Sequence, residues 1–271
     1  MTRNRQAGVS LLNVLAILAV GTGLVQVMLS DQDVALQRLA SANDVAQAQS
    51  LARSGITSVA VTLRRDFGTA PLSDHPGEPW ADAAQERIAL DFGQYDVSIV
   101  DGRGMFDLNA LHPAALAEQR VFAALLTILG LPETLAGQIT QIITQNGPLR
   151  APQDLVRLGI AQGDIDRLAP HVTATPVRGP MNLNTVTEPL MAALLSNPPA
   201  ARGLIARRAA KGFLDASDLS ALGVPLPPLA GFTSDVFDVT ANASVGVARA
   251  ALRRRLLRDP DSGAVQSIPL Q

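Results

Sequence analysis

Apolar residues fill the chain between Arg5 and Asp31, where no charged side chain occurs. As a helix, residues 9–29 would span about 30 Å, the thickness of one bilayer core. This run is too long for a cleaved secretory signal, and no site with small residues follows it. Arg3 and Arg5 precede the run, whereas Asp31 and Asp33 follow it. The positive-inside rule therefore predicts a single membrane span with a cytoplasmic N-terminus and the rest of the chain outside the cytoplasm.

Helical spacing of apolar residues continues beyond this predicted span. No proline occurs in residues 32–67, and an apolar stripe is formed by Leu39, Ala42, Ala46, Ala52, Ile56, Val59, Leu63 and Phe67. Joined to the span, the stripe predicts one helix of about 60 residues, roughly 90 Å long. A coiled-coil stalk is the alternative, but the stripe lacks sustained heptads and Gly55 interrupts it.

The remaining pattern predicts strands on both sides of a helical region. Residues 68–79 contain several helix breakers and should end the long helix. Alternating residues then predict strands at 87–90 and 95–100, and strand patterns return at 236–243, 245–256 and 264–268. Between them, helical patterns occur at 114–129, 132–145, 152–158, 164–171, 188–195, 200–211 and 216–222. The predicted fold class is α+β, with an all-helical subdomain inserted into one sheet, because each strand group alone is too small to be stable.

The predicted helical insert contains an internal repeat. The pattern Asp-Leu-x-x-Leu-Gly-apolar starts at Asp154 and again at Asp218, each time after a helix rich in aliphatic residues. This order is typical of helix-hairpin-helix units. We expect the repeat core to consist of Leu155, Leu158, Gly159, Leu219, Leu222 and Gly223. Such hairpins often bind nucleic-acid phosphates, but neither carries a basic cluster, so we predict a structural platform.

Composition excludes several kinds of chemistry. The chain has a net charge of −2 and no cysteine, which argues against a general nucleic-acid-binding field and excludes disulfides and thiolate metal sites. Its three histidines have no metal-ligand spacing, and no nucleophile elbow, P-loop or HExxH motif occurs. Three Asp-x-Asp pairs lack EF-hand spacing. We therefore predict no enzyme activity and assign no catalytic residue, no metal ligand and no cofactor.

A short basic leader that ends in Gly8 directly precedes the apolar helix. Residues 5–12, RQAGVSLL, resemble the class III signal of type IV pilins and pseudopilins. The resemblance implies that prepilin peptidase cuts between Gly8 and Val9, and that Val9 is then methylated. Most members carry Glu at the fifth residue after the cut, but this chain has Asn13. That departure is typical of the K-type minor pseudopilins of type II secretion systems.

Two further motifs extend the resemblance to the K type over nearly the whole chain. GMFDLN at 104–109 and NLNT at 182–185 match patterns found before and within the helical insert of that family. The resemblance implies a pilin-like antiparallel sheet carrying a large helical insert. The implied segments are a leader at 1–8, a transmembrane helix at 9–29, a periplasmic spine at 30–68, a first part of the pilin-like domain at 69–112, the helical subdomain at 113–232 and the remaining strands at 233–271.

The resemblance also implies a function and partners. We expect a non-enzymatic minor pseudopilin at the tip of the pseudopilus, anchored in the inner membrane with most of the chain in the periplasm. Its partners would be other minor pseudopilins and prepilin peptidase, with no nucleic acid. The alternatives are a pilus-like or DNA-uptake component that binds nucleic acid through the hairpins, and a membrane-anchored periplasmic enzyme, which the residue inventory disfavours. Some relatives hold calcium in the helical insert, so calcium is compatible with the resemblance, without assigned ligands.

Overall fold

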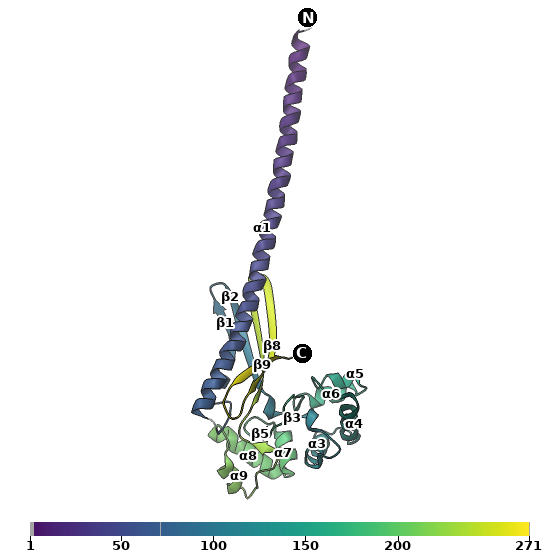
Figure 1. Ribbon diagram of the computed structural model, residues 1–271, viewed down its shortest axis with the longest axis vertical. Coiled ribbons are helices and arrows are strands. Elements are labelled where there is room, and N and C mark those ends of the chain that lie inside the picture. Colours follow the sequence, from purple (N-terminus) through teal and green to yellow (C-terminus); the bar gives the residue numbers. More distant parts are fainter. Residues whose placement is uncertain (1–2, 71, 271) are drawn as a thin grey trace.

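The computed structural model describes residues 3–70 and 72–270, apart from the side chains of residues 3–13, 85 and 87. Helix α1 (Arg3–Thr69) is one uninterrupted element, and its N-terminal half projects far from the folded domain (Figure 1). Residues 14–43 are all exposed. The helix contains an 18-residue window with a mean hydropathy of 1.8, none of it buried. By length and composition α1 can therefore cross a membrane, and the predicted long helix is confirmed.

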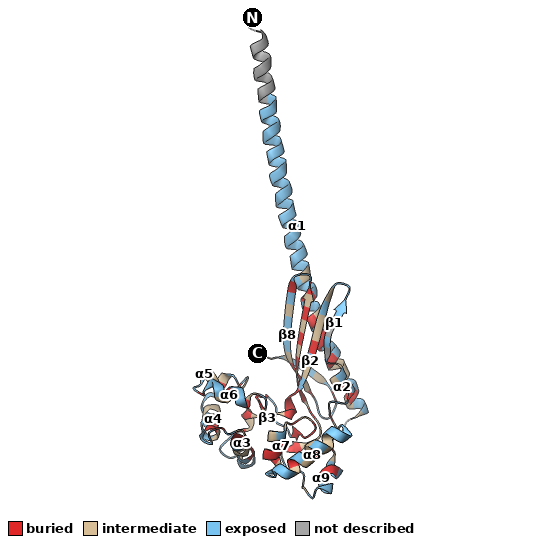
Figure 2. Cartoon of the chain, turned by 180° about the vertical axis from the view of Figure 1, so that it is seen from behind, coloured by how far each residue is buried: buried red, intermediate tan, exposed pale blue. Residues whose placement is uncertain are grey.

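The C-terminal half of α1 packs on one face of a five-stranded antiparallel sheet. The strands are β1 (Gln85–Leu90), β2 (Gly93–Asp101), β7 (Val236–Val245), β8 (Ala248–Arg258) and β9 (Val265–Pro269), and they lie in the order β1-β2-β7-β8-β9. Helix residues spaced three or four apart, from Ala52 through Ile56 and Val59 to Leu63, are buried against the sheet. Figure 2 shows buried residues below the exposed part of the helix, where α1 and the strands lie together.

Gly55 lies on the side of α1 that faces the sheet. A Cβ at this position would stand 2.8 Å from the Val97 Cγ2 atom and 3.5 Å from the Ala241 Cβ atom. The residue that interrupts the apolar stripe in the sequence is therefore required by the packing, since only glycine lets the two backbones approach so closely.

A helical insert follows β2 and returns to the sheet at β7, at the end of the molecule opposite the N-terminus (Figure 1). Its α-helices are α3 (Leu116–Ile128), α4 (Thr134–Asn146), α5 (Asp154–Arg157), α6 (Gln162–Leu168), α7 (Glu188–Leu195), α8 (Pro198–Lys211) and α9 (Ala216–Ala221). Each lies close to a helix predicted from the sequence. A short helix α2 (Pro79–Asp82) and two 3-10 turns, η1 (Gly102–Gly104) and η2 (Leu108–Ala110), complete the helical elements.

The insert is built as two successive halves, each closed by a short parallel strand pair. β3 (Phe106–Asp107) pairs with β4 (Val172–Thr173) around α3 to α6, and β5 (Met181–Asn182) pairs with β6 (Ala230–Gly231) around α7 to α9. The two sequence motifs that resemble each other, FDLN and MNLN, start these halves. Their strand character was not predicted, because two residues are too short to show alternation.

The expected core of the repeat is partly wrong. Leu155 and Leu219 are fully buried, but Leu158 and Leu222 are 39% and 40% exposed. Each of the exposed leucines is the C-cap of a short helix, followed by a glycine with positive φ. The residue after the glycine then donates its N–H to the carbonyl oxygen of the buried leucine. Ile160 bonds Leu155 and Val224 bonds Leu219, both at 3.0 Å. In this Schellman turn the buried contact joins those two residues, while the C-cap side chain points outward.

A second difference concerns the turn between the last long strands. The sequence pattern started the second of them at Val245, whereas β7 continues to Val245 and β8 begins at Ala248. The turn residue Gly246 has a φ of +54°, which favours glycine. Because Gly246 and Val247 occupy a tight turn, Val245 stays in β7, opposite Ala248.

Candidate functional site

The residues predicted for N-terminal processing lie at the start of α1. Gly8, Val9 and Asn13 belong to the helix, but their side chains lie outside the described part of the structure. The cut after Gly8, the methylation of Val9 and the role of Asn13 therefore stay predictions.

The exposed part of α1 is apolar on all sides up to Leu29. From Asp31 on, polar and apolar side chains are mixed along it. Between Val14 and Leu29 the large aliphatic side chains are 50–72% exposed, which is the pattern of a helix surrounded by lipid. Beyond Asp31 and Asp33, apolar side chains are still uncovered, and they are Val34 (44%), Leu36 (64%), Leu39 (68%) and Val45 (41%). Apolar residues exposed on a water-facing helix indicate an interaction surface.

The two hairpins offer no uncompensated basic cluster among the described residues that flank their glycines. Near Gly223, the Lys211 amino group lies 2.6 Å from an Asp215 oxygen and 2.9 Å from an Asp218 oxygen. Arg207 also contacts Asp218, at 3.4 Å. These carboxylates form the capping box of α9, and the Lys211 contact lowers the pKa of both. The cations are thus paired within the fold, which does not favour phosphate binding.

The NLNT motif holds a buried aspartate at the junction of the sheet and the insert. The Asp101 Oδ2 atom accepts hydrogen bonds from Thr185 (2.5 Å), Ser234 (2.6 Å) and Asn182 (3.0 Å). Asn182 also donates to the Asp74 carbonyl oxygen at 2.8 Å. Burial raises the pKa of Asp101, and these hydrogen bonds oppose the rise. The motif therefore joins the end of β2, the start of the second half of the insert and the segment before β7.

The FDLN motif plays the same part for the first half of the insert. Asp107 accepts hydrogen bonds from the Thr175 N–H at 3.0 Å and the Thr175 hydroxyl at 2.6 Å. The Asn109 side chain donates to the Leu149 carbonyl at 2.9 Å and accepts from the Leu149 N–H at 2.8 Å. Polar side chains here replace the backbone pairing that two-residue strands cannot supply.

The contacts of Asp101, Asp107 and their partners form a polar seam between the sheet and the insert, and two buried arginines add ion pairs to it. Arg103 pairs with Asp235, Arg255 pairs with Asp238, and both also donate to carbonyl oxygens of residues 174–177 in the insert. Neither pair was identified from the sequence. Arg103 and Asp235 are 132 residues apart in the chain, whereas Asp238 and Arg255 lie opposite each other on β7 and β8. The seam fixes the insert to the sheet in one orientation, since buried charges require their partners.

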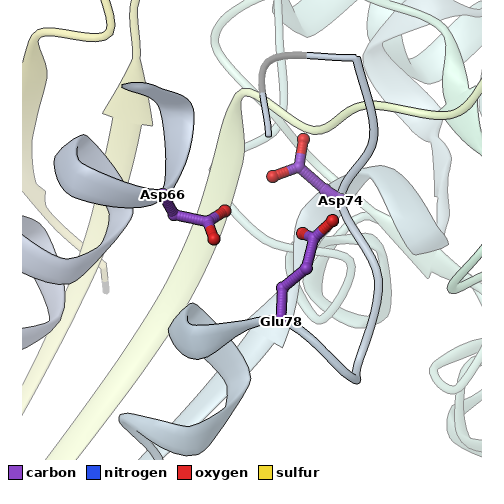
Figure 3. Close-up of side chains that lie close together, drawn as sticks. All are labelled: Asp66, Asp74 and Glu78. Carbon is purple, nitrogen blue, oxygen red and sulfur yellow. The ribbon is translucent and has the colours of Figure 1, made fainter. Parts of the chain in front are cut away.

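Three carboxylates meet beside the seam, at the end of α1 (Figure 3). Asp66, Asp74 and Glu78 are all buried, and the nearest guanidinium belongs to Arg258. Burial raises the pKa of Asp66 to about 6, with the Glu78 charge adding to the rise and Arg258 opposing it. Burial also raises the pKa of Asp74 to about 7, although Arg258 and the Ser234 N–H bind it. No metal was assigned to these residues from the sequence, because they follow no ligand motif.

Comparison with known proteins agrees with this architecture. A family model described as "Type II secretion system (T2SS), protein K" matches residues 181–240, from the start of the NLNT motif to within β7. Type II secretion system protein K of Pseudomonas aeruginosa is 28% identical over 302 aligned positions, covering 96% of this chain and 91% of that protein. The protein of the same name from Klebsiella pneumoniae is also 28% identical, covering 78% and 77%.

The chain is therefore similar to type II secretion system protein K over most of its length. A solved structure supports its fold: a chain in the crystal structure of the GspK-GspI-GspJ complex from enterotoxigenic Escherichia coli superposes with a TM-score of 0.65. That match has 18% identity and covers 85% of this chain and 97% of the other. The resemblance to K-type pseudopilins drawn from Gly8, Asn13 and the two motifs is thereby confirmed at the level of the family.

Proposed function

We propose that this protein is a non-enzymatic minor pseudopilin that caps the tip of a type II secretion pseudopilus and supports export of folded proteins. The observation that carries the proposal is the placement of the insert, which lies at the end of the molecule farthest from the projecting part of α1 (Figure 1). In a fibre whose subunits align their long helices, this insert would occupy the space of the subunit ahead. A subunit of this shape is compatible with the first position only.

The membrane end of the helix supports the same position. In the pilin family, Glu at the fifth mature residue is thought to pair with the N-terminal amine of the preceding subunit. A first subunit has no predecessor, and an unpaired carboxylate in lipid would be costly. The neutral Asn13 removes that cost. On this proposal, residues 9–29 lie in the inner membrane, and the domain lies in the periplasm.

The partners on this proposal are other minor pseudopilins. The matched crystal structure is titled as a complex of GspK with GspI and GspJ, so we expect two corresponding subunits to bind here. The uncovered apolar residues of α1 beyond the membrane, such as Leu36 and Leu39, are suited to contact their helices.

Processing tests the proposal directly. In a strain that lacks this gene, wild-type protein should restore secretion, lose residues 1–8 by intact mass, and copurify with other minor pseudopilins. Gly8→Ala should slow the cut and reduce secretion, because the peptidase accepts little bulk before the cut. Gly21→Ala is the matched control, since nothing lies within 4 Å of the Cβ it would add. Normal secretion by an uncut Gly8→Ala protein would contradict the proposal.

Nucleic-acid binding separates the proposal from the DNA-uptake alternative. Non-specific affinity comes from lysines and arginines that replace counterions on the phosphates, and those flanking the second hairpin are paired with carboxylates. We expect no retardation of duplex DNA by the purified protein at near-physiological salt. Submicromolar binding would favour the alternative.

A further inference from the structure

The cluster of Asp66, Asp74 and Glu78 lies outside both the helical insert and the assembly surface. Asp66 is in the last turn of α1, Asp74 is in the loop that follows, and Glu78 is the N-cap of α2. They are 2%, 0% and 5% exposed, and one oxygen from each lies within 4.8 Å of the others. Figure 3 shows the three carboxylates directed toward one another. This separation equals the spacing of oxygens on opposite sides of a calcium ion, for ligand distances of about 2.3–2.6 Å.

The charges of the cluster are not balanced by the protein. The Arg258 Nη2 atom lies 2.5 Å from the Asp74 Oδ2 atom, and Arg258 Nη1 lies 4.0 Å from Asp66 Oδ2. The remaining basic group is His75, whose Nε2 atom lies 3.2 Å from a Glu78 oxygen and which is charged only when protonated. With neutral His75, three carboxylates facing one guanidinium leave an excess of two negative charges. Such an excess in a buried site is costly unless a cation or protons compensate it.

The hydrogen bonds show which oxygens lack a partner. Both oxygens of Glu78 are occupied, by the Ser73 hydroxyl at 2.8 Å and by the His75 N–H and the Trp80 indole N–H at 3.1 and 3.0 Å. In contrast, both oxygens of Asp66 and the Oδ1 atom of Asp74 are buried and accept no hydrogen bond. Buried acceptors without partners are rare in folded proteins. The Arg258 Nη1 atom is also buried without a hydrogen bond, but it lies 4.0 Å from Asp66 Oδ2, beyond hydrogen-bond distance. The three oxygens are thus free to bind a ligand.

We propose that Asp66 and Asp74, with Glu78 beside them, bind one hard divalent cation, and that calcium suits the site best. Carboxylate oxygens are ligands for calcium and magnesium alike, but magnesium usually keeps several waters, which a buried site does not provide. Two positive charges also equal the excess negative charge of the cluster with Arg258 in place. The ion would tie the end of α1 to the loop that carries Asp74.

The same loop links the site to the rest of the molecule. Asp74 donates its N–H to the Phe232 carbonyl at 2.8 Å, and the Ser234 N–H donates to Asp74 Oδ2 at 2.7 Å. His75 stacks on Phe213 of the insert, with ring centroids 5.0 Å apart. A bound cation would therefore lock the long helix, the insert and the start of β7 together. The inference rests on these contacts and is independent of the proposed function.

Trp80, the single tryptophan of the chain, provides a local probe because its indole touches Glu78. Full-length protein in detergent is treated with a chelator, dialysed, and titrated with terbium, a calcium substitute whose luminescence a nearby indole excites. We expect terbium luminescence through Trp80 that calcium abolishes by competition, with one ion bound here. Calcium should also raise Tm, because a ligand that binds only the folded state stabilises it.

Asp66→Asn removes one ligand charge and keeps the side-chain shape. We expect this variant to lose the terbium signal and the calcium-dependent rise in Tm, while its Tm without calcium is equal to or above that of the wild type. Asp166→Asn, on an exposed position of α6 in the insert, is the matched control and should bind as the wild type does.

Two results would overturn the site. One is no terbium luminescence and no calcium effect on Tm in the wild type up to about 10 mM, above the range of weak calcium modules; protons would then neutralise the cluster. The other is an unchanged Trp80-excited signal in Asp66→Asn. Should that variant fail to unfold cooperatively, the competition in wild-type protein alone decides.

Discussion

The two cores of this protein are built from different kinds of residue. Between α1 and the sheet, alanine and valine make up about half of the buried side chains, and Gly55 faces Val97 and Ala241 of the sheet. In the insert, leucine makes up half of the buried apolar side chains and alanine is the next most frequent residue. A long helix laid along a sheet needs small residues to approach it, whereas short helices need long side chains to fill the space between them. The two regions therefore reach close packing with different mixtures of side chains.

A polar seam, not a shared apolar core, joins the two regions. Asp101, Asn182, Ser234 and the pairs of Arg103 and Arg255 lie between the two clusters. Hydrogen bonds between buried groups are directional, so they fix the orientation of the insert as well as its attachment.

The largest effect is expected in the core of the insert. Leu155→Ala should lower the free energy of unfolding by about 2–5 kcal/mol, because it leaves a cavity at a fully buried position. Leu158→Ala, three residues on and 39% exposed, should cost clearly less. Chemical denaturation of both variants measures the difference. Leu219 and Leu222 form an equivalent pair in the second half. Equal losses within either pair would contradict the Schellman-turn packing.

An intermediate effect is expected in the seam. Asn182→Ala removes hydrogen bonds to the Asp74 carbonyl, the Asp101 carboxylate and the Ser234 hydroxyl, all buried. We expect a loss of about 1–3 kcal/mol, the usual cost of a buried polar group left unsatisfied. Asn242→Ala is the control, since its amide bonds a partly exposed Asp96 on the sheet. Equal losses of stability in Asn182→Ala and Asn242→Ala would show that the seam does not hold the insert.

The smallest effects on the free energy of unfolding are expected along α1, where two glycine substitutions should act in opposite directions. Gly55→Ala should destabilise the protein by about 1 kcal/mol, because the clash with the stiff Val97 side chain outweighs the gain in helix propensity. Gly68→Ala meets no atom within 4 Å and should be neutral or stabilising by up to about 1 kcal/mol. Thermal unfolding of the two variants compares them. A stabilising Gly55→Ala would mean that the helix lies farther from the sheet.

The sequence predicted those features that depend on local pattern. The long helix, the strand pairs and the helices of the insert followed from periodicity and helix breakers, because residues near in the chain determine them. The outward direction of Leu158 and Leu222 depends on cap geometry, which the repeat spacing does not reveal. The pairing of β3 with β4 and of β5 with β6, and the meeting of Asp66 with Asp74 and Glu78, depend on tertiary contacts. Motif spacing carries no information on such contacts.

The position of this subunit at the tip is central to its proposed function. The measurement that tests it most directly is immunogold labelling of assembled pseudopili with an antibody against residues 113–232, viewed by electron microscopy. We predict label at one end of each fibre, because the insert blocks the addition of a subunit ahead of it. Label distributed along the shaft would contradict the tip assignment.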